Sequence, residues 1–168
     1  EEVRDFFYQR QNYFHELDTA AEELTARMRM HSADVRTEIV TRLEAVHNVS
    51  IRRRVDLGET VLHRYDPRTR VLEINRHLSG GQQVFKMAAE LAYLECGREI
   101  EALIDGASFG SEEAGRLARL GLANYYAAAV VLPYTQFHGA AEEFEYDIER
   151  LSAFFSVSYE TIAHRLST

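Results

Sequence analysis

The sequence predicts an α+β domain that is mainly helical and carries one small three-stranded antiparallel sheet. Apolar residues recur at helical spacing through most of the chain, whereas strict alternation of apolar and polar residues is confined to residues 49–75. The chain has 168 residues, of which 46% are hydrophobic and 27% are charged. These proportions are typical of a globular domain that buries its own core, so disordered and fibrous classes are excluded.

Helices are expected in the first fifty residues. An aromatic-rich segment from Asp5 to Leu17 precedes Thr19-Ala20-Ala21-Glu22, whose spacing is that of a capping box. This box predicts a helix that runs to about Met30. Ser32 is the expected cap of a second helix, which ends near His47-Asn48.

The middle of the chain is expected to form the sheet. Residues 49–55 alternate as a strand does, and Leu57-Gly58-Glu59 breaks the pattern. Two further strands, residues 60–65 and 70–75, flank a turn at Asp66-Pro67-Arg68-Thr69. Consecutive strands joined by short connections predict an antiparallel meander.

Helices then continue to the end of the chain. An amphipathic pattern predicts a central helix over residues 82–96, and residues 98–104 form a short helical piece. Ser111 is the expected cap of a long, alanine-rich helix that runs to about Leu132, where Pro133 ends it. Three short helices close the chain, at residues 134–143, 147–155 and 158–167, and the last two are joined by a tight turn at Ser156-Val157.

Charge and cysteine content limit the classes of function. A net charge of −8 argues against a domain that wraps nucleic acid. The single Cys96 cannot form an internal disulfide, which indicates a reducing cytoplasm, and no apolar run is suited to span a membrane. The first residue is not Met, so we expect an excised domain of a longer protein.

The central helix carries the pattern Ala89-Glu90-Leu91-Ala92-Tyr93, and residues 120–127 and Leu132-Pro133 follow on the next long helix. This layout resembles the zinc-peptidase-like domain of the ImmA/IrrE family, in which an H-E-x-x-H helix precedes an E-x-x-A-N-x-F-A helix that ends in proline. At the matching positions Ala89, Tyr93 and Leu120 replace the three metal ligands, and only Glu90, the general base, remains. Alanine and leucine cannot bind zinc, so we expect a metallopeptidase-like core helix without a metal site and without peptidase activity.

The flanking segments make the resemblance more specific. The segments 3–7, 13–18, 117–133, 146–151 and 164–166 are similar to those of the sensory domain of actinobacterial short-chain fatty-acid regulators of the RamB and PrpR type. That resemblance implies that residues 1–168 form a single domain that binds short-chain acyl-CoA or CoA. It also implies an N-terminal helix-turn-helix domain that contacts operator DNA and a cysteine-bearing C-terminal region that can hold an iron–sulfur cluster, both outside this fragment, which itself takes no cofactor.

Candidate ligand-binding residues lie first on the central helix. Phe85, Ala89 and Tyr93 form a stripe at helical spacing, which is either a pocket wall or ordinary core. Lys86 and Glu90 are four residues apart and form either an exposed ion pair or a polar pair in that pocket.

Arginines are the candidates for the phosphates of CoA. Arg53 shares a strand face with apolar Val49 and Ile51, so it must reach water, pair with a carboxylate such as Glu73, or meet a ligand anion. The complete predicted ligand-binding set is Phe14, Arg27, Arg53, Arg54, Lys86, Ala89, Glu90, Tyr93, Tyr125 and Arg165.

The sequence therefore predicts the effector domain of a cytoplasmic, homo-oligomeric regulator of acetate or propionate metabolism, with the branch (glyoxylate or methylcitrate) left open. Phe14 and its aromatic neighbours are expected to couple the effector to the DNA-binding domain. The alternatives are a zinc-dependent peptidase-like enzyme that uses Glu90 and a histidine, and a ligand-free dimerisation module. The closing helices resemble a helix-turn-helix, but the acidic residues among them argue against DNA contact.

Overall fold

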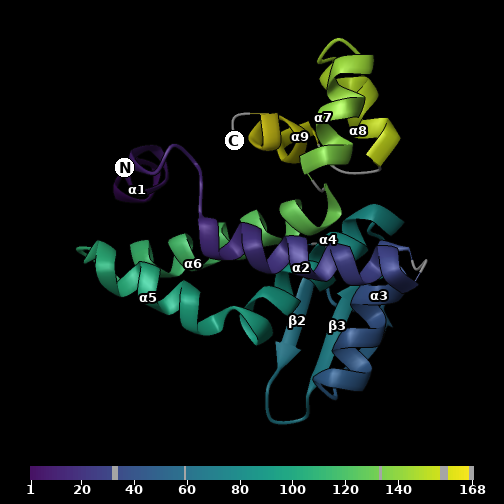
Figure 1. Ribbon diagram of the computed structural model, residues 1–168. Coiled ribbons are helices and arrows are strands. Elements are labelled where there is room, and N and C mark those ends of the chain that lie inside the picture. The colour runs from purple at the N-terminus through teal and green to yellow at the C-terminus, as the bar shows by residue number, and fades with distance from the viewer. Residues whose placement is uncertain (32–33, 59, 133, 156–158, 167–168) are drawn as a thin grey trace.

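A computed structural model describes residues 1–31, 34–58, 60–132, 134–155 and 159–166 of the chain (Figure 1). Within these residues the chain is mainly helical with one small sheet, as the sequence predicts. The helices are α1 (Glu2–Gln9), α2 (His15–His31), α3 (Val35–Thr41), the π-helix η1 (Arg42–Val46), α4 (Gly80–Glu95), α5 (Gly97–Ala107), α6 (Glu112–Val131), α7 (Tyr134–Glu143), α8 (Ile148–Phe155) and α9 (Tyr159–Leu166). The strands are β1 (Ser50–Arg54), β2 (His63–Asp66) and β3 (Val71–Asn75).

Polar side chains cap three of these helices. The Ser79 hydroxyl accepts from the backbone N–H of Gln82, whose side chain accepts from the Ser79 N–H, so a complete capping box begins α4. Ser111 caps α6 as predicted. Asp34 caps α3, and the predicted cap Ser32 lies outside the described residues, as does the predicted turn at Ser156-Val157.

The predicted start of the helix at Thr19 is wrong. Helix α2 begins at His15, four residues before Thr19, so Thr19-Ala20-Ala21-Glu22 lies inside the helix. The buried stripe explains the difference, because Leu17 is fully buried and continues the helical spacing of Ala21 and Leu24 toward the N-terminus. The next predicted helix is also interrupted, since regular α3 ends at Thr41 and continues as the wider π-helix η1.

The predicted antiparallel meander is wrong for one strand pair. The strand order is β1-β3-β2: β2 pairs antiparallel with β3, but β1 pairs parallel with β3, beginning with Ser50 opposite Val71. Asn75 explains why the segment after β1 does not pair as a neighbour. Its side-chain N–H donates to the carbonyls of Gly58 and Val61, which holds that segment as a crossover and delays β2 to His63.

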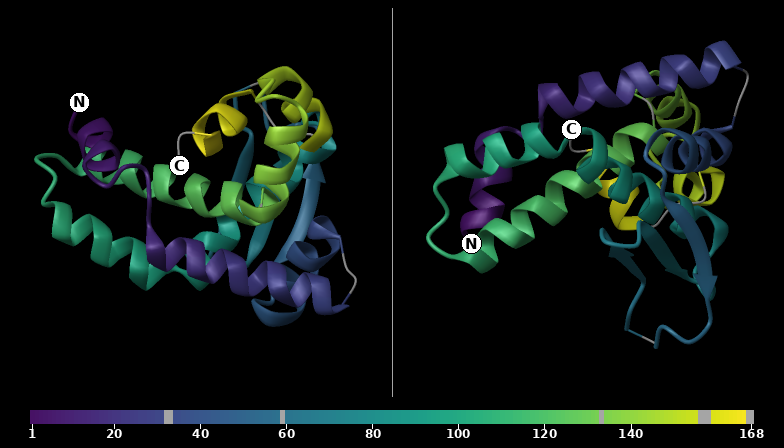
Figure 2. Two further views of the ribbon diagram at one scale, coloured as in Figure 1. Left: turned by 45° about the horizontal axis from the view of Figure 1, so that its top comes forward. Right: turned by 90° about the horizontal axis from the view of Figure 1, so that it is seen from below.

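The core is centred on α6, which packs on α4 and on α2 (Figure 2). Alanines at 118, 123 and 127 are fully buried and let the neighbouring helices approach closely. The sheet joins this core through Leu72 and Ile74 of β3. In the described part of the chain, no helix has the length and apolar character needed to cross a bilayer.

Helices α7–α9 have a smaller apolar cluster of their own, which includes Leu132, Phe137, Leu151 and Ile162. Val131 at the end of α6 packs against both clusters. Figure 1 shows α7–α9 on one side of α6 and the sheet on the other.

A charged contact joins η1 to the end of α4. The Arg42 side chain donates from Nε to Oε1 of Glu95 at 2.6 Å, and Nε2 of His47 lies 3.0 Å from the same oxygen. The Arg42 and Glu95 side chains are only 16% and 17% exposed. Removing one partner of such a pair leaves the other charge poorly solvated.

We expect Glu95→Ala to lower the free energy of unfolding by about 2 to 3 kcal/mol, because Arg42 loses its carboxylate. The matched control is Glu101→Ala, which breaks the 2.6 Å pair with Arg119 at a site where the Glu101 side chain is 51% exposed. That variant should lose less than about 1 kcal/mol. Urea unfolding measures the loss of stability in each variant. Equal losses in Glu95→Ala and Glu101→Ala would contradict the role given to the Arg42–Glu95 pair.

Candidate functional site

The predicted ligand-binding residues fall into separate groups in the fold. Phe14, Tyr125 and Arg165 meet where α2, α6 and α9 come together. Lys86, Ala89, Glu90 and Tyr93 lie along α4. Arg53 and Arg54 lie on β1, and Arg27 is exposed on α2.

Tyr125 is the centre of the first group. Its hydroxyl donates to a carboxylate oxygen of Asp18 at 2.8 Å and accepts the backbone N–H of Phe14 at 3.3 Å. Burial, together with the hydrogen bond to Asp18, raises the pKa of Tyr125 above its usual range, so the phenol stays protonated. The side chain therefore acts as a fixed hydrogen-bond donor at the junction of α2 and α6.

Arg165 completes this group from α9. It is 8% exposed, and its Nη1 lies 3.6 Å from the other carboxylate oxygen of Asp18. Its buried Nε has no hydrogen-bond partner among the described residues. A guanidinium in this state has donor capacity for a further acceptor. The sequence analysis did not select Asp18, although its place in the first turn of the helix that follows Phe14 was the available signal.

An aromatic cluster connects this junction to α1. The Phe14 ring lies 5.1 Å from Tyr125, 5.1 Å from Phe7 and 5.6 Å from Phe6. Gly121 of α6 makes room for the cluster, because a Cβ there would lie 2.7 Å from Cζ of Phe7. Rings in these edge and tilted arrangements contribute beyond their buried area, so α1 is firmly attached to α6 through Phe14.

The α4 group lies around a buried acid. Ala89 is 3% exposed and Glu90 is 6% exposed, while Tyr93 is half-buried. Burial raises the pKa of Glu90 to about 7. Burial and then the charge of Glu90 raise the pKa of Tyr93 as well. Near neutral pH, Glu90 therefore exists in both its neutral and its ionised form.

An exposed Lys86–Glu90 ion pair, one of the two interpretations from the sequence, is wrong. Glu90 is buried, and burial alone lowers the pKa of half-buried Lys86, with no contribution from Glu90. Burial and the charge of Lys86 lower the pKa of His63, which indicates that β2 lies close to this end of α4.

The positions that match the family's metal ligands are apolar or aromatic. Ala89 is buried, Tyr93 is half-buried, and Leu120 is 43% exposed on α6. Within the described ranges, no three His, Cys, Asp or Glu side chains gather as a metal-binding group.

The structure selects the first of the environments expected for Arg53. Arg53 is exposed, so it reaches water, and Glu73 does not pair with it. Glu73 instead accepts from Arg54 at 3.0 Å and from Arg64 at 2.6 Å. Alternation along the strands explains this result. Arg64 lies opposite Glu73, and Arg54 shares their face of the sheet, whereas the adjacent Arg53 points to the other face.

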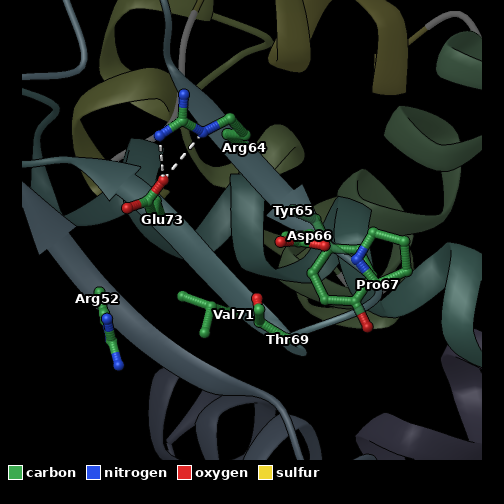
Figure 3. Close-up of a pocket in the computed structure, with 8 residues that line it drawn as sticks. All are labelled: Arg52, Arg64, Tyr65, Asp66, Pro67, Thr69, Val71 and Glu73. Atoms are coloured by element: carbon green, nitrogen blue, oxygen red, sulfur yellow. Dashed lines mark hydrogen bonds and ion pairs between the residues drawn. The ribbon is translucent and has the colours of Figure 1, made fainter.

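A pocket of about 550 Å³ opens on this part of the sheet (Figure 3). Its wall includes Arg52, Arg64 and Glu73, together with Tyr65 and Pro67 near the β2–β3 turn. Figure 3 shows Arg64 and Glu73 joined and Arg52 standing apart from them. The sequence analysis did not select Arg52 or Arg64, because only the pairing of β1 with β3 brings these residues to one pocket.

Known proteins resemble this chain over its full length. The HTH-type transcriptional regulators RamB and PrpR of Mycobacterium tuberculosis are 70% and 40% identical to it over 168 residues. A propionyl-CoA carboxylase regulator of Cereibacter sphaeroides is 36% identical over 169 residues. The alignments cover 100% of this chain but 35% of each relative, so the chain spans about a third of their length.

A solved structure and a family profile agree with these relatives. A Mycobacterium tuberculosis transcriptional regulator has a TM-score of 0.87 and 40% identity, over 99% of this chain and 51% of that one. The profile of the IrrE N-terminal-like domain (Peptidase_M78) matches residues 44–167. Because that match covers well over half of the sequence, the chain belongs to the IrrE N-terminal-like domain family.

Proposed function

We propose that this chain is the effector-binding domain of a transcriptional regulator and that its effector is CoA or a short-chain acyl-CoA. The relatives named RamB and PrpR are HTH-type transcriptional regulators, and a third is named for a carboxylase of propionyl-CoA. In this proposal, another part of the regulator contacts operator DNA. The regulator is cytoplasmic and controls acetate or propionate metabolism.

The observation that carries the proposal is the convergence of Phe14, Tyr125 and Arg165. Arg165 is buried, and its Nε has no partner in the part of the chain that the structure describes; an arginine in such a place is suited to bind an anionic ligand group. A phosphate of CoA is such a group, and the neutral carbonyl oxygen of a thioester is a further acceptor for the same N–H. Asp18 holds the guanidinium in position until the ligand arrives.

The α4 group is suited to the acyl end of the ligand. Ala89 is small, and the neutral form of Glu90 can donate a hydrogen bond to a thioester carbonyl. Helix α6 packs against both α2 and α4, so a ligand that contacts both groups would span this helix.

Coupling to the rest of the regulator would run through Phe14. This side chain contacts Tyr125 on the ligand side and Phe6 and Phe7 of α1 on the other side. A ligand that binds differently to two arrangements of this cluster shifts the equilibrium between them, and α1 moves with it.

A peptidase is the other function that the family name suggests. The three replaced ligand positions oppose it, because Ala89 and Leu120 have no donor atom for zinc. The relatives with the highest identity given above are named as regulators and not as enzymes. Stoichiometric zinc in the purified chain, with peptide hydrolysis, would support the enzyme and contradict our proposal.

Ligand binding is expected to raise the melting temperature of the chain in a concentration-dependent manner. At 100 times the Kd the stabilisation is about 2.7 kcal/mol. Arg165→Gln should weaken the binding of acetyl-CoA or propionyl-CoA about tenfold or more, because the anion loses its guanidinium. Arg29→Gln, at an exposed position on α2 outside the predicted ligand-binding set, is the matched control and should bind as the original chain does. Unchanged melting with CoA and both thioesters would contradict the proposal.

The buried acid predicts a specific pH dependence of stability. Native Glu90 keeps its proton up to a pKa of about 7, whereas the unfolded chain releases it near 4.5. As pH rises from 4.5 to about 7, ionisation of Glu90 therefore stabilises the unfolded chain but not the native one. The free energy of unfolding falls by at most about 3 kcal/mol over this pH range.

Glu90→Gln should remove this fall, so the variant becomes more stable relative to the original chain as pH rises from 4.5 to 7. Chemical unfolding across that range measures the difference. Glu99→Gln, at an exposed position, should give a difference that does not change with pH. A constant difference for Glu90→Gln would show that its carboxyl titrates normally.

The coupling route predicts a change in α1 on ligand binding. Propionyl-CoA should slow amide hydrogen exchange in Glu2–Gln9 of the original chain, and Phe14→Leu should confine the slowing to α2 and α6. Tyr8→Leu is the control, since Tyr8 lies on α1 with 79% of its surface exposed. Equal slowing of hydrogen exchange in α1 in the original chain and in Phe14→Leu would contradict the coupling route.

A further inference from the structure

Lys86 is the only lysine in the 168-residue sequence, and it lies on α4 in an unusual environment. Its side chain is half-buried, and Nζ lies 5.9 Å from the centre of the Phe85 ring. Burial lowers the pKa of Lys86, and no carboxylate among the described residues acts to raise it again. Lys86 is therefore neutral in a larger share of molecules than an exposed lysine, and the neutral amine is the nucleophilic form.

His63 of β2 is a titratable neighbour of this amine. After burial, the positive charge of Lys86 is the second cause that lowers the pKa of His63, so the two side chains interact. The lowered pKa keeps the imidazole neutral near pH 7, and a neutral imidazole has a nitrogen lone pair that accepts a proton. A nucleophilic amine on α4 thus has a proton acceptor nearby on β2.

The residues proposed for the acyl end of the effector lie one turn further along the same helix. Ala89 and Glu90 follow Lys86 by three and four residues, so the three side chains lie on one side of α4. The reactive group of a short-chain acyl-CoA is its thioester, which joins the acyl group to CoA. A thioester held close to an amine reacts far faster than the same two groups in solution, because their approach is already made on binding.

We propose that Lys86 is a modification site that takes the acyl group from bound acyl-CoA. The inference rests on the proposed function, because the bound effector brings the thioester to α4. The Lys86 nitrogen attacks the thioester carbonyl, so a carbon–nitrogen bond forms and the carbon–sulfur bond breaks. The amine proton passes to His63 and from there to the leaving sulfur. The products are an acylated lysine and CoA with a free thiol.

Acylation changes the chemistry of the site. It removes the positive charge of Lys86 and leaves an apolar group on α4 on the same side as Ala89. The acyl group remains after CoA has dissociated, so the chain keeps a covalent record of its effector.

Intact-mass spectrometry of the chain incubated with propionyl-CoA counts the propionyl groups that become covalently attached. The chain also carries Arg116→Lys, which adds an ordinary lysine at an exposed position of α6 as an internal reference. Digestion with trypsin locates each group, because acylated Lys86 is not cleaved and residues 77–98 remain one peptide. Lys86 should react at least about tenfold faster than the reference lysine, with a rate that saturates as propionyl-CoA is increased.

Two further measurements test the chemistry of the step. His63→Gln should slow the acylation of Lys86 about tenfold or more and leave the reference lysine unchanged, because only Lys86 loses its proton acceptor. Hydroxylamine cleaves thioesters but not amides, so the attached group should survive it, whereas a group on the thiol of Cys96 would be lost.

The outcomes separate this inference from the proposed function. The inference is overturned if propionyl-CoA raises the melting temperature but Lys86 reacts no faster than the reference lysine. A rate that rises with propionyl-CoA without saturation would also overturn it, since that is the behaviour of a reaction from solution. A chain that neither binds propionyl-CoA nor becomes acylated would overturn both the inference and the proposed function.

Discussion

The hydroxyl of Tyr125 joins parts of the chain that are more than a hundred residues apart. It binds the Phe14 backbone and the Asp18 carboxylate, and Asp18 in turn faces Arg165 of α9. Through Phe14 the contact reaches the aromatic cluster of α1, and through Arg165 it reaches the helices with the second apolar cluster. Without it, α6 would keep its packing against α4, but it would lose its hydrogen bonds to Phe14 and to Asp18 of α2.

Much of this arrangement follows from local sequence patterns. Ser79 and Ser111 cap the helices that the sequence predicts, and the alanines of α6 are buried as expected. Strand direction was not predictable from alternation, which fixes the faces of a strand but not its partner. Asn75 holds the crossover after β1 by hydrogen bonds to Gly58 and Val61, which are tertiary contacts that no local pattern shows.

The candidate site was predictable only in part, because it also depends on tertiary contacts. Phe14, Tyr125 and Arg165 are each plausible from the sequence, but only the packing of α2, α6 and α9 brings them together and adds Asp18. Alternation places Arg53 on the strand face away from Glu73, so it reaches water, which is one of the environments that the sequence predicts for it. On α4 the sequence identified Glu90, and burial explains how an acid without metal partners can remain protonated near neutral pH and donate a hydrogen bond.

Native mass spectrometry of the chain mixed with CoA, acetyl-CoA and propionyl-CoA tests the central claim most directly. The method weighs the intact complex, so it distinguishes a bound thioester from its hydrolysed products and from a bound metal ion. Our account predicts one intact CoA compound per chain and no stoichiometric zinc. A chain that retains zinc and none of the three compounds would contradict it.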